Sequence, residues 1–73
     1  MIKMTLFQQI RWIREDQVIV LLNINGQEIF RCRYKSDIPS DLLDQEIFNI
    51  CVSWVRWANR RDQECAFIIT LKI

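Results

Sequence analysis

The dipeptide Asn25-Gly26 lies between two runs of β-branched and aromatic residues, and it constrains the fold more than any other feature of the sequence. Both residue types tolerate the positive φ angles of a type I′ turn, so the pattern predicts a β-hairpin with a two-residue loop. Such a loop also fixes which residues face each other across the hairpin. The predicted pairs are Ile24 with Gln27, Leu22 with Ile29, Leu21 with Phe30, Val20 with Arg31, Ile19 with Cys32, and Val18 with Arg33.

The two faces of this hairpin differ in polarity. The face that we expect to hold a helix is apolar on both strands and carries Ile19, Leu21, Phe30, Cys32 and Tyr34. The opposite face mixes a basic row, defined as Arg31, Arg33 and Lys35, with apolar residues that include Val18 and Val20. Arginine suits carboxylate partners and the valines add apolar burial, so we expect this surface to contact an acidic region of another protein. The apolar content of the same face also favours a homodimer.

The segment after the first few residues predicts a helix. Thr5 and Gln8 have the spacing of a capping box, in which each side chain accepts a hydrogen bond from the other residue's backbone N–H. Leu6, Ile10 and Ile13 then recur at helical spacing. We expect a helix of about three turns, which is too short to be stable alone and must pack on the hairpin.

Residues 41–58 are compatible with two different structures. Leu43, Ile47, Ile50, Trp54 and Trp57 recur at helical spacing, which predicts a helix over 41–58. The stretch "IFNICVSWV" is also rich in β-branched and aromatic residues that alternate with Asn49, Cys51 and Ser53, which predicts a strand. The final run, "CAFIITLKI", follows a polar turn and predicts a strand in either case.

The segment "SDIPSDLLDQEI", residues 36–47, resembles a D-I-P-x-x-L-L-D-x-E-V/I motif found in short, mostly uncharacterised proteins of phages and mobile elements of Gram-positive bacteria. The order of parts is similar too: a capped helix, a hairpin, this acidic turn and a closing apolar run. In that family the turn leads directly into a strand, so the resemblance favours a strand after residue 46. The long connection "VRWANRRDQE" departs from the family pattern and keeps the helical alternative open.

The fold class predicted from these elements is α+β. We expect one N-terminal helix packed on a four-stranded antiparallel sheet, and the alternative is helix, hairpin, a second helix over 41–58 and a final strand. A length of 73 residues predicts a single domain, 1–73. One glycine and one proline imply that the connections between elements are short.

The sequence offers little for catalysis, and we expect no enzyme, no metal and no cofactor. Histidine is absent, which removes the commonest general base and metal ligand. Three cysteines without C-x-x-C spacing argue against a disulfide framework or a structural zinc site. An acidic row remains, and acids in such a turn usually cap amides and complement the helix dipole. The acidic row consists of Asp37, Asp41, Asp44 and Glu46, and we regard it as a second candidate contact surface.

A basic-aromatic cluster is the third candidate site, and it consists of Arg56, Trp57, Arg60 and Arg61. Arginines beside aromatic rings can hold single-stranded nucleic acid, and a four-stranded sheet can present them. The net charge of only +1 and the lack of an RNP-type motif argue against this use. We therefore expect no nucleic-acid partner.

The class that remains is a protein-binding module that acts stoichiometrically. The resemblance implies a phage or mobile-element product that binds a host protein and occludes it, in the sharpest form an anti-CRISPR or other inhibitor of a bacterial defence enzyme. The alternatives are a sheet-based nucleic-acid-binding module and a protein that sequesters a small signalling nucleotide. No signal peptide or membrane-spanning run is evident, so we expect a protein of the host-cell cytoplasm with no membrane contact.

Overall fold

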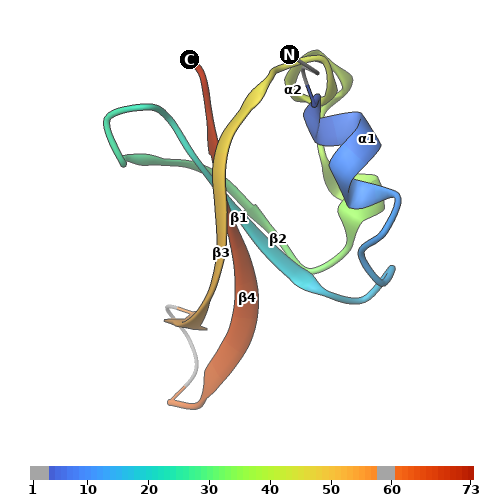
Figure 1. The fold of residues 1–73 in the computed structure, drawn as a ribbon. Coiled ribbons are helices and arrows are strands. Elements are labelled where there is room, and N and C mark those ends of the chain that lie inside the picture. Colours follow the sequence, from blue (N-terminus) through green and yellow to red (C-terminus); the bar gives the residue numbers. More distant parts are fainter. Residues whose placement is uncertain (1–3, 58–60) are drawn as a thin grey trace.

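The computed structural model describes residues 4–57 and 61–73 and has an α+β fold with short helices and a four-stranded mixed sheet. Figure 1 shows the helices gathered on one side of a strongly twisted sheet, with the far end of the β3–β4 hairpin extending beyond them. The elements in chain order are α1 (Leu6–Ile10), β1 (Val18–Leu22), β2 (Glu28–Cys32), the 3₁₀ turn η1 (Lys35–Asp37), α2 (Ser40–Leu43), β3 (Ile47–Arg56) and β4 (Gln63–Leu71).

The first hairpin forms as predicted over most of its length, but its loop differs. Cα pairs Ile19 with Cys32, Val20 with Arg31, and Leu21 with Phe30 are confirmed. Leu22 pairs with Glu28 rather than Ile29, because a bulge shifts the register there. Only Gly26 has a positive φ, 84°, among the described residues, so a type I′ turn is wrong.

Asn23 explains the different loop. The Gly26 N–H donates to the Asn23 carbonyl at 2.9 Å, and the Asn23 side-chain Oδ1 accepts from the backbone N–H of Asn25 and of Gln27. A turn followed by one left-handed glycine is the three-residue hairpin loop with a bulge. The asparagine side chain thus holds a longer loop than the dipeptide alone predicts.

Helix α1 begins where predicted and ends early. The capping box between Thr5 and Gln8 is present in both directions. The helix ends at Ile10, so a length of three turns is wrong. Beyond it the chain turns so that Ile13 enters the core while Trp12 remains 85% exposed. Lys35 Nζ donates to the carbonyls of Ile10 at 3.0 Å and Ile13 at 2.8 Å, which satisfies acceptors that the helix end leaves open.

The segment that had two readings is a strand. β3 runs for ten residues from Ile47 to Arg56, so a second helix over 41–58 is wrong. Helical structure before it is limited to η1 and the single turn α2. The β-branched and aromatic content of "IFNICVSWV" therefore outweighs its helical spacing.

The strand order is β2-β1-β4-β3, and the sheet is mixed rather than antiparallel as predicted. Each hairpin is antiparallel, but β1 and β4 pair in parallel, from Val18 with Ala66 to Leu22 with Thr70. Residues 33–46 link one edge of the sheet to the other, which is long enough for such a crossover. The two most apolar strands thereby occupy the centre, where both faces can be covered.

Buried side chains form two clusters on opposite faces of the sheet. The larger one joins the sheet to the helices and contains Leu6, Ile10, Ile13, Ile19, Leu21, Cys32, Ile38, Ile69 and Leu71. The smaller one contains Val18, Val20 and Ala66, with Leu22, Val55, Trp57 and Ile68 packed against them. Both faces of β1 and β4 are therefore covered, whereas the edge strand β3 contributes little to either cluster.

Candidate interaction surface

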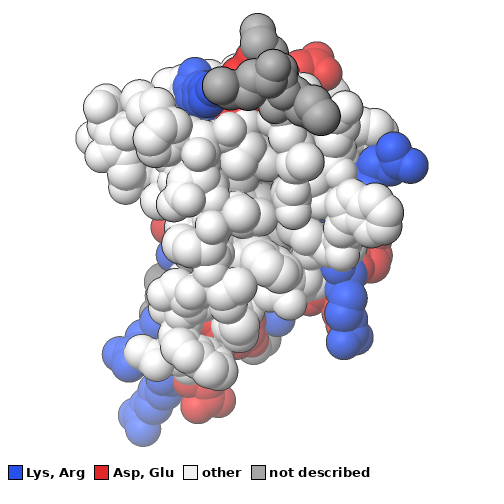
Figure 2. Space-filling model, in the orientation of Figure 1, with Lys and Arg blue, Asp and Glu red and all other residues white. Residues whose placement is uncertain are grey.

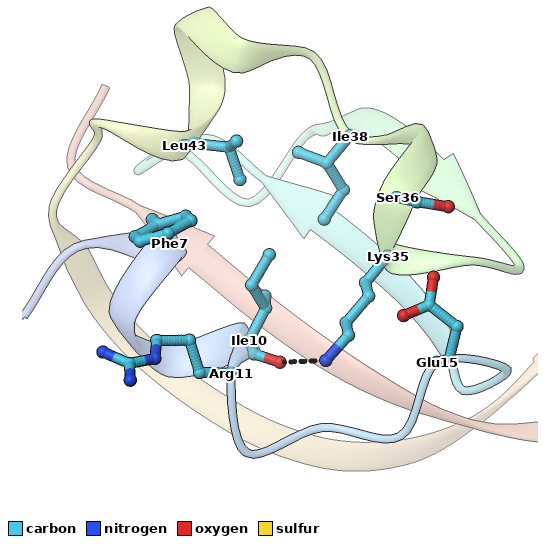
Figure 3. A pocket seen from close by; sticks show the side chains of 8 residues that line it. All are labelled: Phe7, Ile10, Arg11, Glu15, Lys35, Ser36, Ile38 and Leu43. Atoms are coloured by element: carbon cyan, nitrogen blue, oxygen red, sulfur yellow. Dashed lines mark hydrogen bonds between the residues drawn. The ribbon is translucent and has the colours of Figure 1, made fainter.

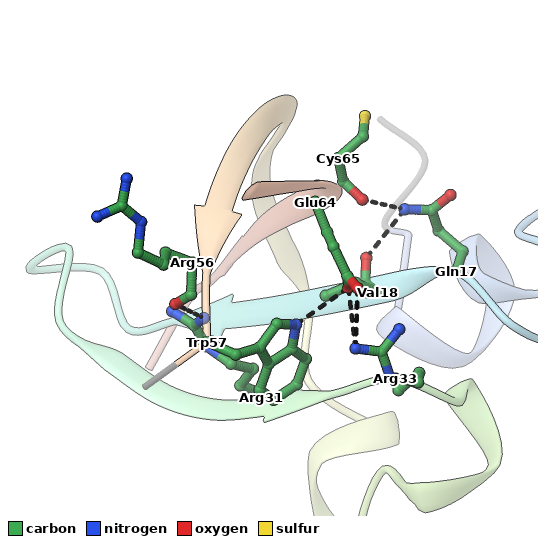
Figure 4. Close-up of polar contacts among 8 residues, drawn as sticks. All are labelled: Gln17, Val18, Arg31, Arg33, Arg56, Trp57, Glu64 and Cys65. Atoms are coloured by element: carbon green, nitrogen blue, oxygen red, sulfur yellow. Dashed lines mark hydrogen bonds and ion pairs between the residues drawn. The ribbon is translucent and has the colours of Figure 1, made fainter. Parts of the chain in front are cut away.

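The surface predicted to bind an acidic partner is largely covered by the chain itself. Val18 and Val20 are only 4% and 3% exposed, because Val55 and Trp57 pack against them. Trp57 directly follows β3, two residues after Val55, and Figure 4 shows its ring beside Arg31 and Arg33 of the neighbouring hairpin. Val18 and Val20, two of the apolar residues that favoured a homodimer through this face, are therefore already in contact with residues of the same chain, whereas Ile24 and Ile29 remain exposed.

Arg31 and Arg33 are held by the same arrangement, which we call the Trp57 cluster and define as Arg31, Arg33, Trp57 and Glu64. Both guanidinium groups lie 5.3 Å from the centre of the Trp57 ring. Arg33 Nη2 lies 3.0 Å from Glu64 Oε2, and the Trp57 ring N–H donates to the same carboxylate at 3.1 Å. Figure 4 shows these groups converging on Glu64.

Arg31 is fixed further by contacts outside that cluster. Its Nη2 lies 2.7 Å from Glu28 Oε1, and its Nη1 donates to the Arg56 carbonyl at 2.9 Å. The hydrogen bonds that Arg31 donates to the Glu28 carboxylate raise the pKa of Arg31 above its ordinary value. At the neighbouring end of the sheet, the Gln17 side chain donates hydrogen bonds to the carbonyls of Val18 in β1 and Cys65 in β4. The arginines therefore act first as internal partners of this chain.

Lys35 does not extend the basic row, so its predicted place on the same strand face is wrong. β2 ends at Cys32, and Lys35 lies in η1 with its Nζ on the carbonyls at the end of α1. The backbone turns after Arg33, which breaks the alternation on which the prediction depended. The predicted contact surface is therefore divided between two parts of the molecule.

The acidic row does not form a single cluster of paired groups. Asp37 lies in η1, Asp41 in the first turn of α2, and Asp44 at the C-terminal end of α2, and all three are exposed. Glu46 is half-buried and its Oε2 lies 3.3 Å from Lys72 Nζ. Pro39, at the N-cap of α2, makes no side-chain cap, and of these acids only Asp41 lies in the first turn of α2, where its negative charge complements the helix dipole.

The basic-aromatic cluster is separated in the structure. Trp57 faces Arg31 and Arg33 within the Trp57 cluster, whereas Arg56 and Arg61 are exposed. In Figure 4 the side chain of Arg56 points away from the Trp57 ring. Arg60 lies outside the described residues. The ring that would stack on a base is thus already occupied by two guanidinium groups.

A pocket lies between α1 and the segment that contains η1 and α2 (Figure 3). Its apolar wall is made by Phe7, Ile10, Ile38 and Leu43, and Arg11 and Glu15 lie at its rim. Lys35 lines it too, but its ammonium group is directed to the Ile10 carbonyl (Figure 3). The pocket is open and shows no convergent set of polar groups that would orient a small ligand.

The most unusual surface belongs to β3, and the sequence-based candidates did not include it. Val52 pairs with Phe67 and Trp54 with Cys65, and Phe67 pairs with Ile19, so these side chains lie on the face that holds the helices. The helices do not reach them. We call Ile50, Val52 and Trp54 the open apolar face, in which Val52 is 60% and Trp54 65% exposed.

The outer edge of β3 is also open along most of its length. The described sheet ends at β3, and the described contact on its outer edge is at its beginning, where Ile47 N–H donates to the Met4 carbonyl at 2.9 Å. Residues 47–55 contain no charged side chain. Figure 2 shows the corresponding surface as a broad uncharged area with charged groups at its margins. The uncharged run is visible in the sequence, but edge strands usually carry charges, so the run alone does not identify an edge strand.

The cysteines differ in environment and are free. Cys32 is buried, and that burial raises the pKa of its thiol to about 11. Cys51 and Cys65 are exposed. Among the residues that the structure describes, no cluster of three or more histidine, cysteine or acidic side chains is arranged to hold a metal ion. In the same part of the chain, no helix is long and apolar enough to cross a lipid bilayer.

Comparison with known proteins gives no assignment. No family model matches the chain, and no significant similarity to a curated protein or a solved structure was found.

Proposed function

We propose that this protein is a stoichiometric protein-binding module and that the open apolar face of β3 is its contact surface. The observation that carries this proposal is the 65% exposure of Trp54 beside Val52, on a ten-residue strand with no charge between Ile47 and Val55. Exposed tryptophans with neighbouring aliphatic residues are the typical anchors of protein interfaces. Large contiguous apolar patches are rare on the free surface of small soluble domains.

The chemistry of this surface favours a protein partner over nucleic acid. Phosphate groups are bound by lysine and arginine, and none lies between Ile47 and Val55. The described arginines nearest to an aromatic ring, Arg31 and Arg33, are engaged with Glu28 and Glu64. A sheet-based nucleic-acid module and a nucleotide-sequestering protein therefore remain the weaker alternatives.

The sharpest form of the proposal is occlusion of a host enzyme by a phage or mobile-element protein, such as an inhibitor of a CRISPR-type defence. Its support is the resemblance of residues 36–47 to proteins of that kind, and the open apolar face supplies a surface for such a contact. The cytoplasm of the bacterial host is the corresponding location.

Affinity capture from a bacterial lysate tests the proposal with a matched pair of variants. Trp54→Glu introduces a charge into the open apolar face, whereas Trp12→Glu changes a side chain that is 85% exposed and lies away from β3. We expect a near-stoichiometric partner, identified by mass, to be retained by the parent and by Trp12→Glu and lost with Trp54→Glu. Equal capture by all three proteins would exclude the open apolar face as the contact surface.

The purified parent also separates the partner classes. Nucleic acid or nucleotide carried through purification raises the ratio of absorbance at 260 nm to that at 280 nm, whereas a protein partner leaves the ratio set by Trp12, Trp54 and Trp57. Suppose that the parent shows a raised ratio and that an Arg56→Glu, Arg61→Glu double variant returns it to the value of pure protein. That result would contradict protein binding and support the nucleic-acid alternative.

A further inference from the structure

We infer that the outer edge of β3 pairs with the same edge of a second copy of this chain, antiparallel, with the two-fold axis at Cys51. This inference builds on the proposed function, because the pairing would place two open apolar faces side by side on one continuous sheet. It concerns the backbone edge of β3, whereas the proposed function concerns the side chains on one of its faces.

The sequence of β3 is self-complementary about Cys51. In an antiparallel pair centred there, residues whose numbers sum to 102 face each other, and each pair joins side chains of one kind. Ile50 faces Val52, Asn49 faces Ser53, Phe48 faces Trp54, and Cys51 faces Cys51 of the second copy. Pairs of β-branched residues and pairs of aromatic residues are the cross-strand combinations that stabilise antiparallel sheets.

The edge is also available for pairing. Within residues 4–57 and 61–73, no strand lies outside β3 from Phe48 onward, and the last described contact on this edge is the hydrogen bond from Ile47 N–H to the Met4 carbonyl. Protected edges usually carry lysine or proline, and residues 47–55 contain neither. The register shift near Phe48 is an irregularity at one end, so we expect the new ladder to be regular over residues 49–53.

Charge favours antiparallel over parallel pairing. One end of β3 adjoins the exposed acids Asp41 and Asp44, and the other end, with the exposed Arg56, Arg61 and Asp62, carries a net positive charge. Antiparallel pairing brings the basic end of each copy to the acidic end of the other. Parallel pairing would bring like charges together, which is unfavourable at an interface.

Crosslinking measures the register directly. At the two-fold axis the two Cys51 Cα atoms would lie about 5 Å apart, within the range that a disulfide spans. Residue 53 is displaced from its own copy by four positions, or about 13 Å, which is too far. In a Cys65→Ser background, we expect copper phenanthroline in air to crosslink Cys51 at least about tenfold faster than a single cysteine placed by Ser53→Cys with Cys51→Ser.

A mixture of two single-site variants tests whether residue 49 of one copy faces residue 53 of the other. Asn49→Cys and Ser53→Cys proteins, each with Cys51→Ser and Cys65→Ser, should crosslink to each other when mixed and poorly when alone. Crosslinking of Ser53→Cys alone at the rate of Cys51 would overturn the register.

Light scattering measures the assembly without oxidation. The parent should reach twice the chain mass of 8.9 kDa as its concentration is raised. Cys51→Lys and Cys51→Glu place like charges opposite each other, so each alone should dimerise at least about fivefold more weakly, and an equimolar mixture should recover the dimer. A parent that remains monomeric at millimolar concentration, or a mixture no better than the separate variants, would overturn the inference.

The two proposals fail separately. Cys51→Lys leaves the open apolar face unchanged, so a monomeric parent that still loses its partner with Trp54→Glu would refute the dimer and retain the proposed function. If the parent forms the predicted crosslinks but Trp54→Glu captures the same partner from lysate as the parent does, the dimer is supported and the proposed function is refuted.

Discussion

The two edge strands of the sheet, β2 and β3, differ in how well they are protected against pairing with another chain. β2 has five residues, a bulge opposite Leu22, and arginines that lie over the Trp57 ring and pair with Glu28 and Glu64. β3 has ten residues with no charge from Ile47 to Val55. A short, bulged and charged edge is the usual protection against unwanted pairing, whereas a long apolar edge invites a partner. This contrast is the reason that the proposed binding is assigned to β3 and not to β2.

The largest expected effect is a difference in the free energy of unfolding between substitutions in the covered part of the sheet and in the open part. Ile69 is fully buried in β4 between the helices and the sheet, and its neighbour across the ladder is the exposed Ile50. Ile69→Ala should lower the free energy of unfolding by about 3 to 4 kcal/mol, because it removes core contacts and leaves a cavity. Val52→Ala on the open apolar face should lower it by about 0.5 kcal/mol or less. Urea denaturation of dilute protein measures both, and equal losses would show that β3 is covered.

A smaller effect is expected at the protected edge. Trp57→Ala removes the ring over Val18 and Val20 and the partner of two guanidinium groups, so we expect a loss of about 2 kcal/mol. Trp57→Phe keeps a ring but loses the hydrogen bond to Glu64, and should lose about 1 kcal/mol. Thermal unfolding of the two variants checks this order. If Trp57→Ala matched the parent, the Trp57 cluster would not hold this edge.

The smallest expected effect concerns the thiol at the end of β2. Burial raises the Cys32 pKa from 9.0 to about 11, so the folded state favours the protonated thiol. The corresponding stability is fully present below pH 9 and is lost as pH rises toward 11, so no effect is expected at neutral pH. Cys32→Val should remove this part of the pH dependence of unfolding. Identical pH profiles for parent and variant would contradict the environment assigned to Cys32.

Local patterns in the sequence predicted much of the fold. The Thr5–Gln8 capping box and three pairs of the first hairpin follow from short-range residue chemistry. For residues 47–56 the local patterns left helix and strand open, and the resemblance favoured the strand that the structure contains. The parallel pairing of β1 with β4 could not be read from the sequence, because two hairpins can join through either edge of each. The carbonyls at the early end of α1 accept hydrogen bonds from Lys35, which is distant in the sequence, so local patterns could not show this contact.

The candidate site was predicted less well, for a related reason. Alternation along a strand correctly placed Arg31 beside Val20, but it gave no sign that Trp57 and Glu64 would cover that face. Periodicity identifies which residues share a face and not which part of the chain packs on it. The uncharged run 47–55 was visible, and its significance depended on β3 becoming an edge strand.

Amide hydrogen exchange as a function of protein concentration tests the contrast between the two edges most directly. In dilute solution, outward amides of β3 between Asn49 and Val55 should exchange at rates near those of unpaired chain, because no described strand covers them. As concentration rises, their exchange should slow at least about tenfold while that of the β2 amides, Glu28–Cys32, stays constant. Protection of β3 that is independent of concentration, or concentration-dependent protection of β2 instead, would contradict the account.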